Sequence, residues 1–371
     1  MLTQVVRSRH VGFRLWLGCR AINFLDRPVR PLISEGTTTS PKEDDELSEA
    51  EKKSPFYLET GYSIFAKRPS RPFPPPFVSP PSGSFSDPLT THNPGRGRRP
   101  YIDGKPIKGL TNGDDAIIIG DQNFLGVNDG VGAWAQKNRG HAALWSRLIA
   151  HFWAAEVAKS FEDGAVALKA LNPIKDLQVA YDRTKSVTKG QEGQNDILGT
   201  TTASSALLHY RDGKPVIMAT TLGDCKVLVV RPKDNKVIYR TKEQWHWFDC
   251  PRQLGTNSPD TPEADAVTDV VDIEVGDIIL VLSDGVTDNL WEHEICTKVS
   301  EAMKKWHDGA EEAKDGIVYV ARQLMNAARE IAQDPHAESP YMERALDEGI
   351  AAEGGKLDDI SVVVGVCRKR E

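Results

Sequence analysis

Four short acidic segments adjoin strand-like runs in this chain, and they limit its fold more than any other feature of the sequence. They are GDD at 113–115, NDG at 128–130, SDG at 283–285 and LDD at 357–359. The runs FLGVN and IILVLS, which lead into two of them, are apolar enough to be core strands. An aspartate at the end of a core strand lies at the rim of its sheet, where carboxylates from several strands can converge. Because converging carboxylates repel one another, they destabilise a fold unless cations neutralise them.

The chemistry of these segments favours a site for divalent cations. Oxygen-only ligands select hard ions such as Mg²⁺ or Mn²⁺. The glycines after Asp129 and Asp284 let the backbone approach closely and leave its carbonyl oxygen free to act as a ligand. Taken singly, each segment also fits a hairpin turn or a solvated surface patch, since Asp-Gly is a strong turn signal. Spacing argues against two other sites. No segment has the ligand pattern of an EF-hand loop, and Gly355 stands where a P-loop beginning at Gly349 needs a lysine.

Hydrophobic periodicity predicts a domain in which clustered strands lie between helices. Apolar residues at helical spacing predict helices, which are expected at 140–159, 174–186, 292–305 and 316–333. Alternating or continuous apolar runs predict strands, which are expected at 56–65, 116–119, 124–128, 201–208, 216–221, 226–230, 237–240, 267–273, 278–282 and 360–366. This order is typical of an α+β domain. The core could be two sheets packed on each other and covered by helices, or one large sheet, and periodicity does not separate the two.

Composition argues against several classes of protein. The formal net charge of -7 argues against a nucleic-acid-binding protein, which usually carries a basic face. No run of about 18 apolar residues occurs, so no transmembrane segment is expected. The five cysteines are odd in number and include no C-x-x-C pair, which argues against a disulfide framework or a structural zinc site.

The N-terminal region has the composition of a targeting segment. Residues 1–25 contain no acidic residue, while arginines recur among apolar residues. This amphipathic pattern predicts a mitochondrial transit peptide at 1–34. The acid-rich stretch 35–54 is predicted to be a disordered linker, and 55–371 a single domain. A Pro-rich insertion at about 69–100 within this domain could be a polyproline II ligand for a partner, or a loop without a packed core.

The order of the motifs closely resembles the protein phosphatase 2C family of metal-dependent phosphatases. The matching motifs are GDDA, FLGVNDGVGAW, ILGTTTASSAL, TLGDCKVLVV, DIILVLSDGVTDNL and GGKLDDISVVV. The segments EQWHWFDCPRQLG and LMNAAREIAQDP look like the mitochondrial branch of that family. The resemblance extends from about Phe56 to the C-terminus, interrupted by the Pro-rich insertion. It implies a central β-sandwich of two antiparallel sheets flanked by helix pairs, with metal ions in a cleft at one end.

The resemblance also implies roles for individual residues. Asp129 matches the aspartate that bridges two metal ions, and Gly130 matches the glycine that ligates through its backbone carbonyl. Asp284 and Asp358 match further ligands of one ion. Asp115 matches the acid that reaches the other ion through water. Asp129, Asp284 and Asp358 are therefore expected to be essential for catalysis.

Other positions match the family's pattern less closely or depart from it. Asp224 and Asp288 match acids near a weaker third ion, and Cys225 stands where relatives have serine. Val131 stands where many relatives have a histidine that can act as general acid. The family's phosphate-binding arginine has no clear match. Lys108 lies in that neighbourhood and is either its substitute or a solvated lysine.

Together these features predict a metal-dependent protein serine/threonine phosphatase. Two Mn²⁺ or Mg²⁺ ions, with room for a third, would activate water for direct attack on phosphoserine or phosphothreonine. No phosphoenzyme is required, which suits a sequence with no evident activated nucleophile. His141 and His246, which lie near the motifs, are expected to be structural.

The resemblance to the mitochondrial branch implies a location in the mitochondrion, with the matrix as the expected compartment. Phosphoproteins there are the expected substrates, and the coenzyme Q pathway is one candidate source of them. Two alternatives stay open. The chain could be a pseudophosphatase that keeps the fold but serves as a binding module. It could also be a small-molecule phosphatase, which would need a pocket deep enough to bury a metabolite.

Overall fold

The computed structural model describes residues 54–77, 100–121, 123–162, 164, 166–190 and 195–371. All of them belong to the compact unit Leu47–Glu371. The predicted transit peptide at 1–34, nearly all of the predicted linker at 35–54 and most of the Pro-rich insertion lie outside the described residues. Among the helices that the structure describes, none combines the length and the hydropathy needed to cross a membrane.

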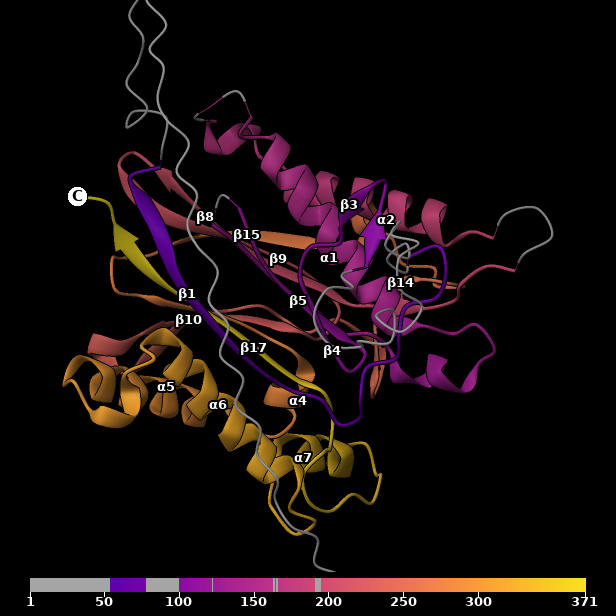
Figure 1. Cartoon of the computed structure of the whole chain (residues 1–371). Coiled ribbons are helices and arrows are strands. Elements are labelled where there is room, and N and C mark those ends of the chain that lie inside the picture. Colours follow the sequence, from indigo (N-terminus) through magenta and orange to yellow (C-terminus); the bar gives the residue numbers. More distant parts are fainter. Residues whose placement is uncertain (1–53, 78–99, 122, 163, 165, 191–194) are drawn as a thin grey trace, which may run out of the picture. The chain divides into compact units, whose positions relative to one another are not determined.

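Two antiparallel sheets form the centre of this unit (Figure 1). The five-stranded sheet runs, in spatial order, β1 (Phe56–Phe65), β17 (Ile360–Lys369), β16 (Ile278–Leu282), β10 (Lys226–Arg231) and β11 (Lys236–Arg240). The six-stranded sheet runs β15 (Val267–Asp272), β9 (Lys214–Leu222), β8 (Ala203–Arg211), β6 (Phe124–Asn128), β5 (Asp115–Gly120) and β4 (Leu110–Asn112). Three short pairs are β2 (Tyr101–Ile102) with β3 (Lys105–Pro106), β7 (Thr200–Thr201) with β14 (Leu254–Gly255), and β12 (Trp245–Trp247) with β13 (Cys250–Pro251).

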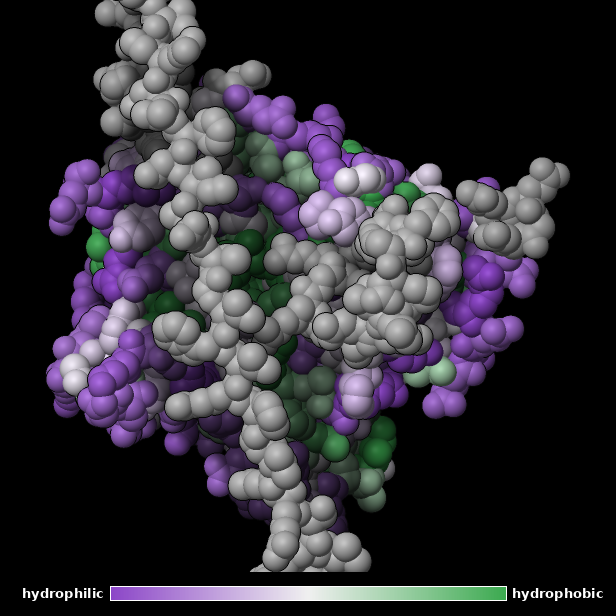
Figure 2. All heavy atoms as spheres, in the orientation of Figure 1, coloured by the Kyte–Doolittle hydropathy of each residue, from purple (hydrophilic) through white to green (hydrophobic). Residues whose placement is uncertain are grey.

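Helix pairs cover the outer faces of both sheets, as Figure 1 shows. The pair on the six-stranded sheet is α1 (Ala142–Lys159) and α2 (Pro173–Thr188), and the pair on the five-stranded sheet is α5 (Glu292–His307) and α6 (Ile317–Ala332). The short helices are α3 (Pro262–Asp265), α4 (Asp284–Thr287) and α7 (Pro340–Asp347), with 3-10 turns η2 (Gly132–Gln136), η3 (Leu168–Ala170), η4 (Pro232–Asp234) and η5 (Glu311–Ala313). In Figure 2, hydrophilic residues cover the outer surface of α5.

The apolar runs form a sandwich because their alternate residues enter different cores. In β16, Ile278, Leu280 and Leu282 pack with α5 and α6. Between them, Ile279 and Val281 pack against the other sheet. Since successive side chains of a strand point to opposite faces, a strand that is apolar throughout must be covered on both faces. The α+β sandwich of two sheets is therefore confirmed, and the alternative of one large sheet is wrong.

The short helices α3, α4 and α7 are not predicted by the sequence pattern, and α7 is the longest of the three. Its N-cap, Ser339, accepts a hydrogen bond on Oγ from the backbone N–H of Met342 at 3.1 Å, and Pro340 occupies the first helical position. Both residue types are favoured there. The helix has only eight residues, of which only Ala345 is fully buried, so it is too short to present a repeated apolar face in the sequence.

Strand registers place the acidic segments at one end of the sandwich. Ala116 of β5 pairs with Asn128 of β6. Leu282 of β16 pairs with both Lys226 of β10 and Val362 of β17. The acids just beyond these pairs are Asp115, Asp129, Asp224, Asp284 and Asp358. We call this end of the sandwich the acidic end.

Candidate metal centre

Asp115 joins the two sheets at the acidic end. It is the first residue of β5 and is 1% exposed. Its Oδ2 accepts a hydrogen bond at 2.7 Å from Oγ of Ser361, which belongs to the other sheet. Within the part of the chain that the structure describes, its Oδ1 is buried and has no hydrogen-bond partner. The free oxygen is available as a ligand.

Asp129 and Gly130 are held by the backbone beside them. The Asp129 N–H donates to Oγ1 of Thr202 at 2.9 Å, and the Asp129 carbonyl accepts from the Thr202 N–H and from Oγ1 of Thr201, each at 2.8 Å. A Cβ at Gly130 would overlap the carbonyl oxygen of Asp114. Glycine is therefore required at this position by close packing, whether or not its carbonyl serves as a ligand.

Asp284 and Asp358 reach the acidic end from neighbouring strands. Asp284 opens α4 immediately after β16, and Asp358 lies just before β17. Oδ2 of Asp284 accepts a hydrogen bond from Nζ of Lys356 at 3.1 Å. Its Oδ1 is buried without a hydrogen-bond partner among the described residues. Asp358 accepts hydrogen bonds on Oδ1 from Nζ of Lys67 and from the backbone N–H of Asp359.

Asp224 and Asp288 also lie at this end, but their surroundings differ. Asp224 Oδ1 is buried and lacks a partner among the described residues. Ligand atoms of Asp129, Asp224 and Cys225 lie within 4.8 Å of one another. The carboxylate of Asp288, in contrast, accepts hydrogen bonds from the Lys356 ammonium at 2.7 Å and from the guanidinium of Arg344. The structure thus brings every acid singled out from the sequence to one end of the sandwich.

The pKa values of these acids reflect burial among like charges. Burial, reinforced by neighbouring carboxylates, raises the pKa of Asp115, Asp129 and Asp224 well above the ordinary value. Asp284 differs: burial opposes its ionisation, but the positive charge of Lys356 brings its pKa down to about 2. The cluster therefore holds more carboxylates than its own cations neutralise.

This donor set fits divalent cations. Asp115, Asp224 and Asp284 each direct one buried, unpartnered carboxylate oxygen into the acidic end. Buried polar atoms are normally hydrogen-bonded, so unpartnered ones need an explanation such as a bound ion. Carboxylate and carbonyl oxygens are the ligands that Mg²⁺ and Mn²⁺ prefer.

Two positively charged side chains at the rim of this site were not predicted from the sequence. Lys67 and Arg68 follow β1, the strand predicted at 56–65. The Lys67 ammonium contacts Asp358, and the Arg68 guanidinium contacts Asp114. The Arg68 side chain remains 42% exposed, so it can still reach a ligand from solvent. The only signal in the sequence is a Lys-Arg pair at the end of a strand, which no spacing rule connects to the aspartates.

Lys108 lies in a different setting. Its Nζ pairs with Oδ2 of Asp121 at 2.6 Å, and these side chains are 48% and 69% exposed. Asp121 is not one of the acids of the metal centre. The interpretation of Lys108 as a solvated lysine is therefore favoured over a role in phosphate binding.

The two histidines near the motifs make structural contacts. Nδ1 of His141 caps α1 by accepting from the Leu144 N–H at 3.2 Å, and its Nε2 lies 3.0 Å from the Pro72 carbonyl. Nε2 of His246 lies 2.9 Å from Oδ2 of Asp260. Both sets of contacts agree with the expectation from the sequence.

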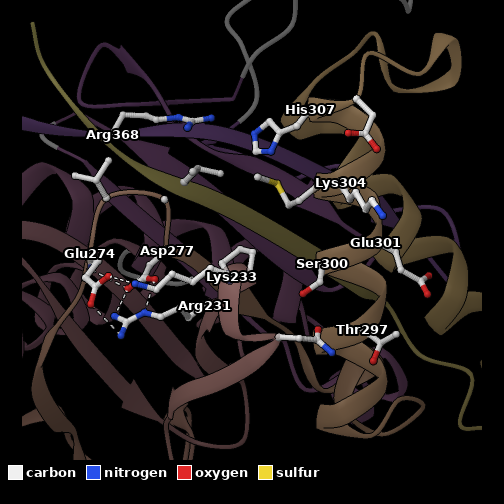
Figure 3. Close-up of a pocket in the computed structure, with 17 residues that line it drawn as sticks. Arg231, Lys233, Glu274, Asp277, Thr297, Ser300, Glu301, Lys304, His307 and Arg368 are labelled. Carbon is white, nitrogen blue, oxygen red and sulfur yellow. Dashed lines mark hydrogen bonds and ion pairs between the residues drawn. The ribbon is translucent and has the colours of Figure 1, made fainter.

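A cavity of about 610 Å³ lies at the opposite end of β10 and β16 (Figure 3). The turn after β10, the turn before β16 and one face of α5 line it. Arg231 and Lys233 form ion pairs there with Glu274, and Arg231 also pairs with Asp277. No acid of the metal centre lines this cavity. It therefore offers no deep pocket for a metabolite beside the aspartates.

Comparison with known proteins identifies relatives. No protein-family model matches the chain. It is 30% identical over 270 residues to the protein phosphatase PTC7 homolog of Homo sapiens, across 70% of this chain and 81% of that protein. It is also 30% identical over 270 residues to the probable protein phosphatase 2C 71 of Oryza sativa subsp. japonica, across 72% of this chain and 50% of that protein.

A solved structure supports the fold. The chain is similar to the photosystem II phosphatase PBCP, with a TM-score of 0.55 and 23% identity. The match covers 83% of this chain and 98% of that one. The sandwich and its flanking helices are therefore an architecture already known among phosphatases.

Proposed function

Since the chain belongs to the protein phosphatase 2C family of metal-dependent serine/threonine phosphatases, we propose that it hydrolyses phosphoserine and phosphothreonine by direct attack of water at a centre of two divalent ions. The observation that carries this proposal is the pair of buried carboxylate oxygens without hydrogen-bond partners among the described residues, Oδ1 of Asp115 and Oδ1 of Asp284. A fold does not keep such atoms unless something binds them.

We assign the ligands from the residues at the acidic end. Asp129, the carbonyl oxygen of Gly130, Asp115, Asp284 and Asp358 would hold the two ions. When bound, Mn²⁺ or Mg²⁺ supplies the acidity that makes water a nucleophile near neutral pH and the positive charge that offsets the phosphate oxygens. The hydrogen bonds from Ser361 to Asp115 and from Lys356 to Asp284 orient the carboxylates before any ligand arrives.

Arg68 is our candidate for binding the phosphate. Its guanidinium lies beside Asp114 at the rim of the metal centre and remains 42% exposed. A guanidinium suits a phosphate because its N–H groups match two oxygens at once. Val131, at the position where many relatives have histidine, carries no proton to donate, so Val131 itself cannot protonate the leaving alkoxide.

The pseudophosphatase alternative is less well supported. A binding module has no use for buried carboxylates that raise one another's pKa, because such a cluster destabilises the fold. The small-molecule alternative would gain support from a deep pocket at the aspartates, and the cavity in Figure 3 lies at the other end of the strands.

Hydrolysis of a phosphothreonine peptide by the full chain tests the proposal. Turnover is expected with Mn²⁺ or Mg²⁺ and not with EDTA, and it should resist inhibitors aimed at other phosphatase classes. Turnover in EDTA would contradict a metal-dependent reaction. No turnover in a protein that has bound its ions would favour the pseudophosphatase.

We further propose that the substrates are mitochondrial matrix phosphoproteins, with proteins of the coenzyme Q pathway as one candidate group. The Arg-bearing, acid-free start of the chain and the resemblance of the segments EQWHWFDCPRQLG and LMNAAREIAQDP to the mitochondrial branch of the family support this location. A fluorescent fusion of the full chain should enter mitochondria, and the same fusion without residues 1–34 should not. Import of both fusions, or of neither, would contradict the transit peptide at 1–34. Phosphoproteomics of mitochondria with and without the active protein would then identify the substrates.

A further inference from the structure

Lys356 places a positive charge inside the acidic end. Its side chain is only 19% exposed. Its Nζ lies 2.8 Å from Oδ1 of Asp249, 3.1 Å from Oδ2 of Asp284 and 2.7 Å from Oδ2 of Asp288. A lysine ammonium has three protons to donate, and these three carboxylates use all of them.

The backbone of Lys356 is fixed as firmly as its side chain. The Lys356 N–H donates to Oδ1 of Asn289, and Nδ2 of Asn289 donates to the Lys356 carbonyl, each at 2.9 Å. Asn289 is 0% exposed and lies just beyond α4, the helix that Asp284 opens. Because one asparagine ties the lysine to the segment that carries Asp284 and Asp288, the ammonium is placed before any ligand binds.

Arg344 of α7 donates a hydrogen bond to Oδ1 of Asp288, the carboxylate oxygen that Lys356 does not contact. Its guanidinium contacts Oδ1 of Asp288 and lies 3.4 Å from both oxygens of Glu243. It also lies over the ring of Trp245, 5.3 Å from the centroid. Both carboxylate oxygens of Asp288 therefore already accept from cations of the protein.

A third divalent ion does not fit this arrangement. The resemblance to the phosphatase family implies such an ion near Asp224 and Asp288. Asp224 has a free oxygen, but Asp288 has none, since Lys356 and Arg344 hold both. A divalent ion at this position would have to displace an ammonium that three carboxylates already hold, and the two cations would repel each other at short range.

We propose that the Lys356 ammonium takes the place of the third divalent ion, so that this phosphatase binds two ions and not three. The proposal rests on the proposed function, because it presumes the two-ion centre. Lys356 then acts as a positioning residue. By holding Oδ2 of Asp284, it leaves Oδ1 as the oxygen available to the ions. Occupancy of the site beside Asp288 would not depend on the concentration of free metal.

Counting bound Mn²⁺ by equilibrium dialysis tests this inference without reference to activity. The full chain is dialysed against Mn²⁺ up to about 1 mM, a range in which weak carboxylate sites fill. Two ions per chain are expected for the unmodified protein. Lys356→Met should gain a third, weaker ion, because it frees oxygens of Asp284 and Asp288. Lys356→Arg keeps a cation there and should stay at two.

Lys226→Met is the matched control. The Lys226 side chain is 15% exposed, close to the 19% of Lys356, but it pairs with Glu243 at 2.9 Å rather than with the acids of the centre. This variant should bind two ions. If this variant also bound a third ion, the extra binding would result from any loss of positive charge, and the specific role of Lys356 would be refuted.

The remaining outcomes separate the inference from the proposed function. No bound Mn²⁺ in the unmodified protein would overturn both. Three ions in the unmodified protein would overturn the inference and leave the two-ion function standing. A Lys356→Met protein with a native near-ultraviolet circular dichroism spectrum and only two ions would also overturn the inference. If that variant failed to fold, the count for the unmodified protein would decide: two supports the inference and three refutes it.

Discussion

Buried carboxylates lie at both ends of strands β10 and β16, but at only one end do protein groups pair with all of their oxygens. At the end shown in Figure 3, Asp277 is 2% exposed and accepts from Nε of Arg231 at 2.9 Å and from its second guanidinium nitrogen at 2.7 Å. The backbone N–H of Glu274 adds a further hydrogen bond at 2.7 Å. At the acidic end, Asp224 and Asp284 each keep an oxygen without a partner among the described residues.

The difference separates a structural carboxylate from a ligand. A buried carboxylate that is fully paired contributes to the integrity of the fold, and removing one partner is strongly destabilising. A buried carboxylate with a free oxygen costs stability until a cation arrives. Burial alone therefore does not distinguish a structural carboxylate from a ligand, and the hydrogen-bond partners of its oxygens must be considered as well.

The largest effect is expected from Asp129→Ala. Mn²⁺-dependent turnover should fall on the order of 10³-fold or more, because the ions lose a ligand and with it several kcal/mol of transition-state stabilisation. The metal-free protein should not melt at a lower temperature, since one of the repelling acids is gone. Steady-state hydrolysis and calorimetry in EDTA measure the two quantities.

Asp121→Ala is the control for this variant. Asp121 is 69% exposed and pairs only with Lys108 among the salt bridges of the described chain, so its loss should change neither quantity. Substantial Mn²⁺-dependent turnover by Asp129→Ala would show that the metal centre is wrongly assigned.

Asp277→Asn should show the opposite pattern at the other end of the strands. The free energy of unfolding should fall by about 1.5–3 kcal/mol, because the Arg231 guanidinium loses its charge-assisted hydrogen bonds to the Asp277 carboxylate while it keeps its ion pair with Glu274. The kcat/KM of the folded protein should stay unchanged. Urea unfolding and assays well below the melting temperature measure both. Loss of activity without loss of stability would show that Asp277 is not a purely structural carboxylate and would contradict the difference between the two ends of the strands.

Arg68→Ala should reduce kcat/KM for a phosphopeptide by about 10- to 100-fold, since a hydrogen bond to a charged group contributes about 1.5–3 kcal/mol. Lys108→Ala should change it by about twofold or less, as for other exposed positions. Parallel assays of the two variants decide between the candidates for phosphate binding. Equal effects, or a larger one for Lys108, would contradict our assignment.

The affinity for Mn²⁺ should weaken as the pH falls. Burial and neighbouring carboxylates raise the pKa of Asp115, Asp129 and Asp224, so protons compete with an ion for these carboxylates more strongly than they would at exposed aspartates. Lowering the pH by one unit should weaken binding by up to about tenfold for each proton released. Calorimetry in buffers of different ionisation enthalpy counts the protons. Binding that releases none would contradict the raised pKa values.

Much of this architecture follows from local pattern. The predicted helices at 174–186 and 292–305 correspond to α2 at Pro173–Thr188 and α5 at Glu292–His307. Hydrophobic periodicity reports the burial of a whole face, so long elements are visible in the sequence. The short α7 is not, because its eight residues are too few to present a repeated apolar face. Yet α7 supplies Arg344, one of the cations that neutralise Asp288.

The aspartates were predictable for a different reason from the cations around them. Asp129 and Asp284 directly follow apolar runs, so their place at a sheet rim follows from a few neighbouring residues, whereas Asp224 and Asp288 were matched only through the family resemblance. Lys67 meets Asp358 across 291 positions of sequence, and Arg344 meets Asp288 across 56. Nothing in the composition or spacing of these segments specifies such a pairing, since any lysine or arginine on the surface carries the same charge.

The sequence by itself determined which residues form the longer strands, that two of these strands lead into Asp129 and Asp284, and that so many acids at one rim require cations. Only the tertiary structure decided where those cations come from. Periodicity and motif spacing are properties of adjacent residues, whereas the balance of charge around a buried carboxylate depends on every group that folding brings within a few ångströms of it.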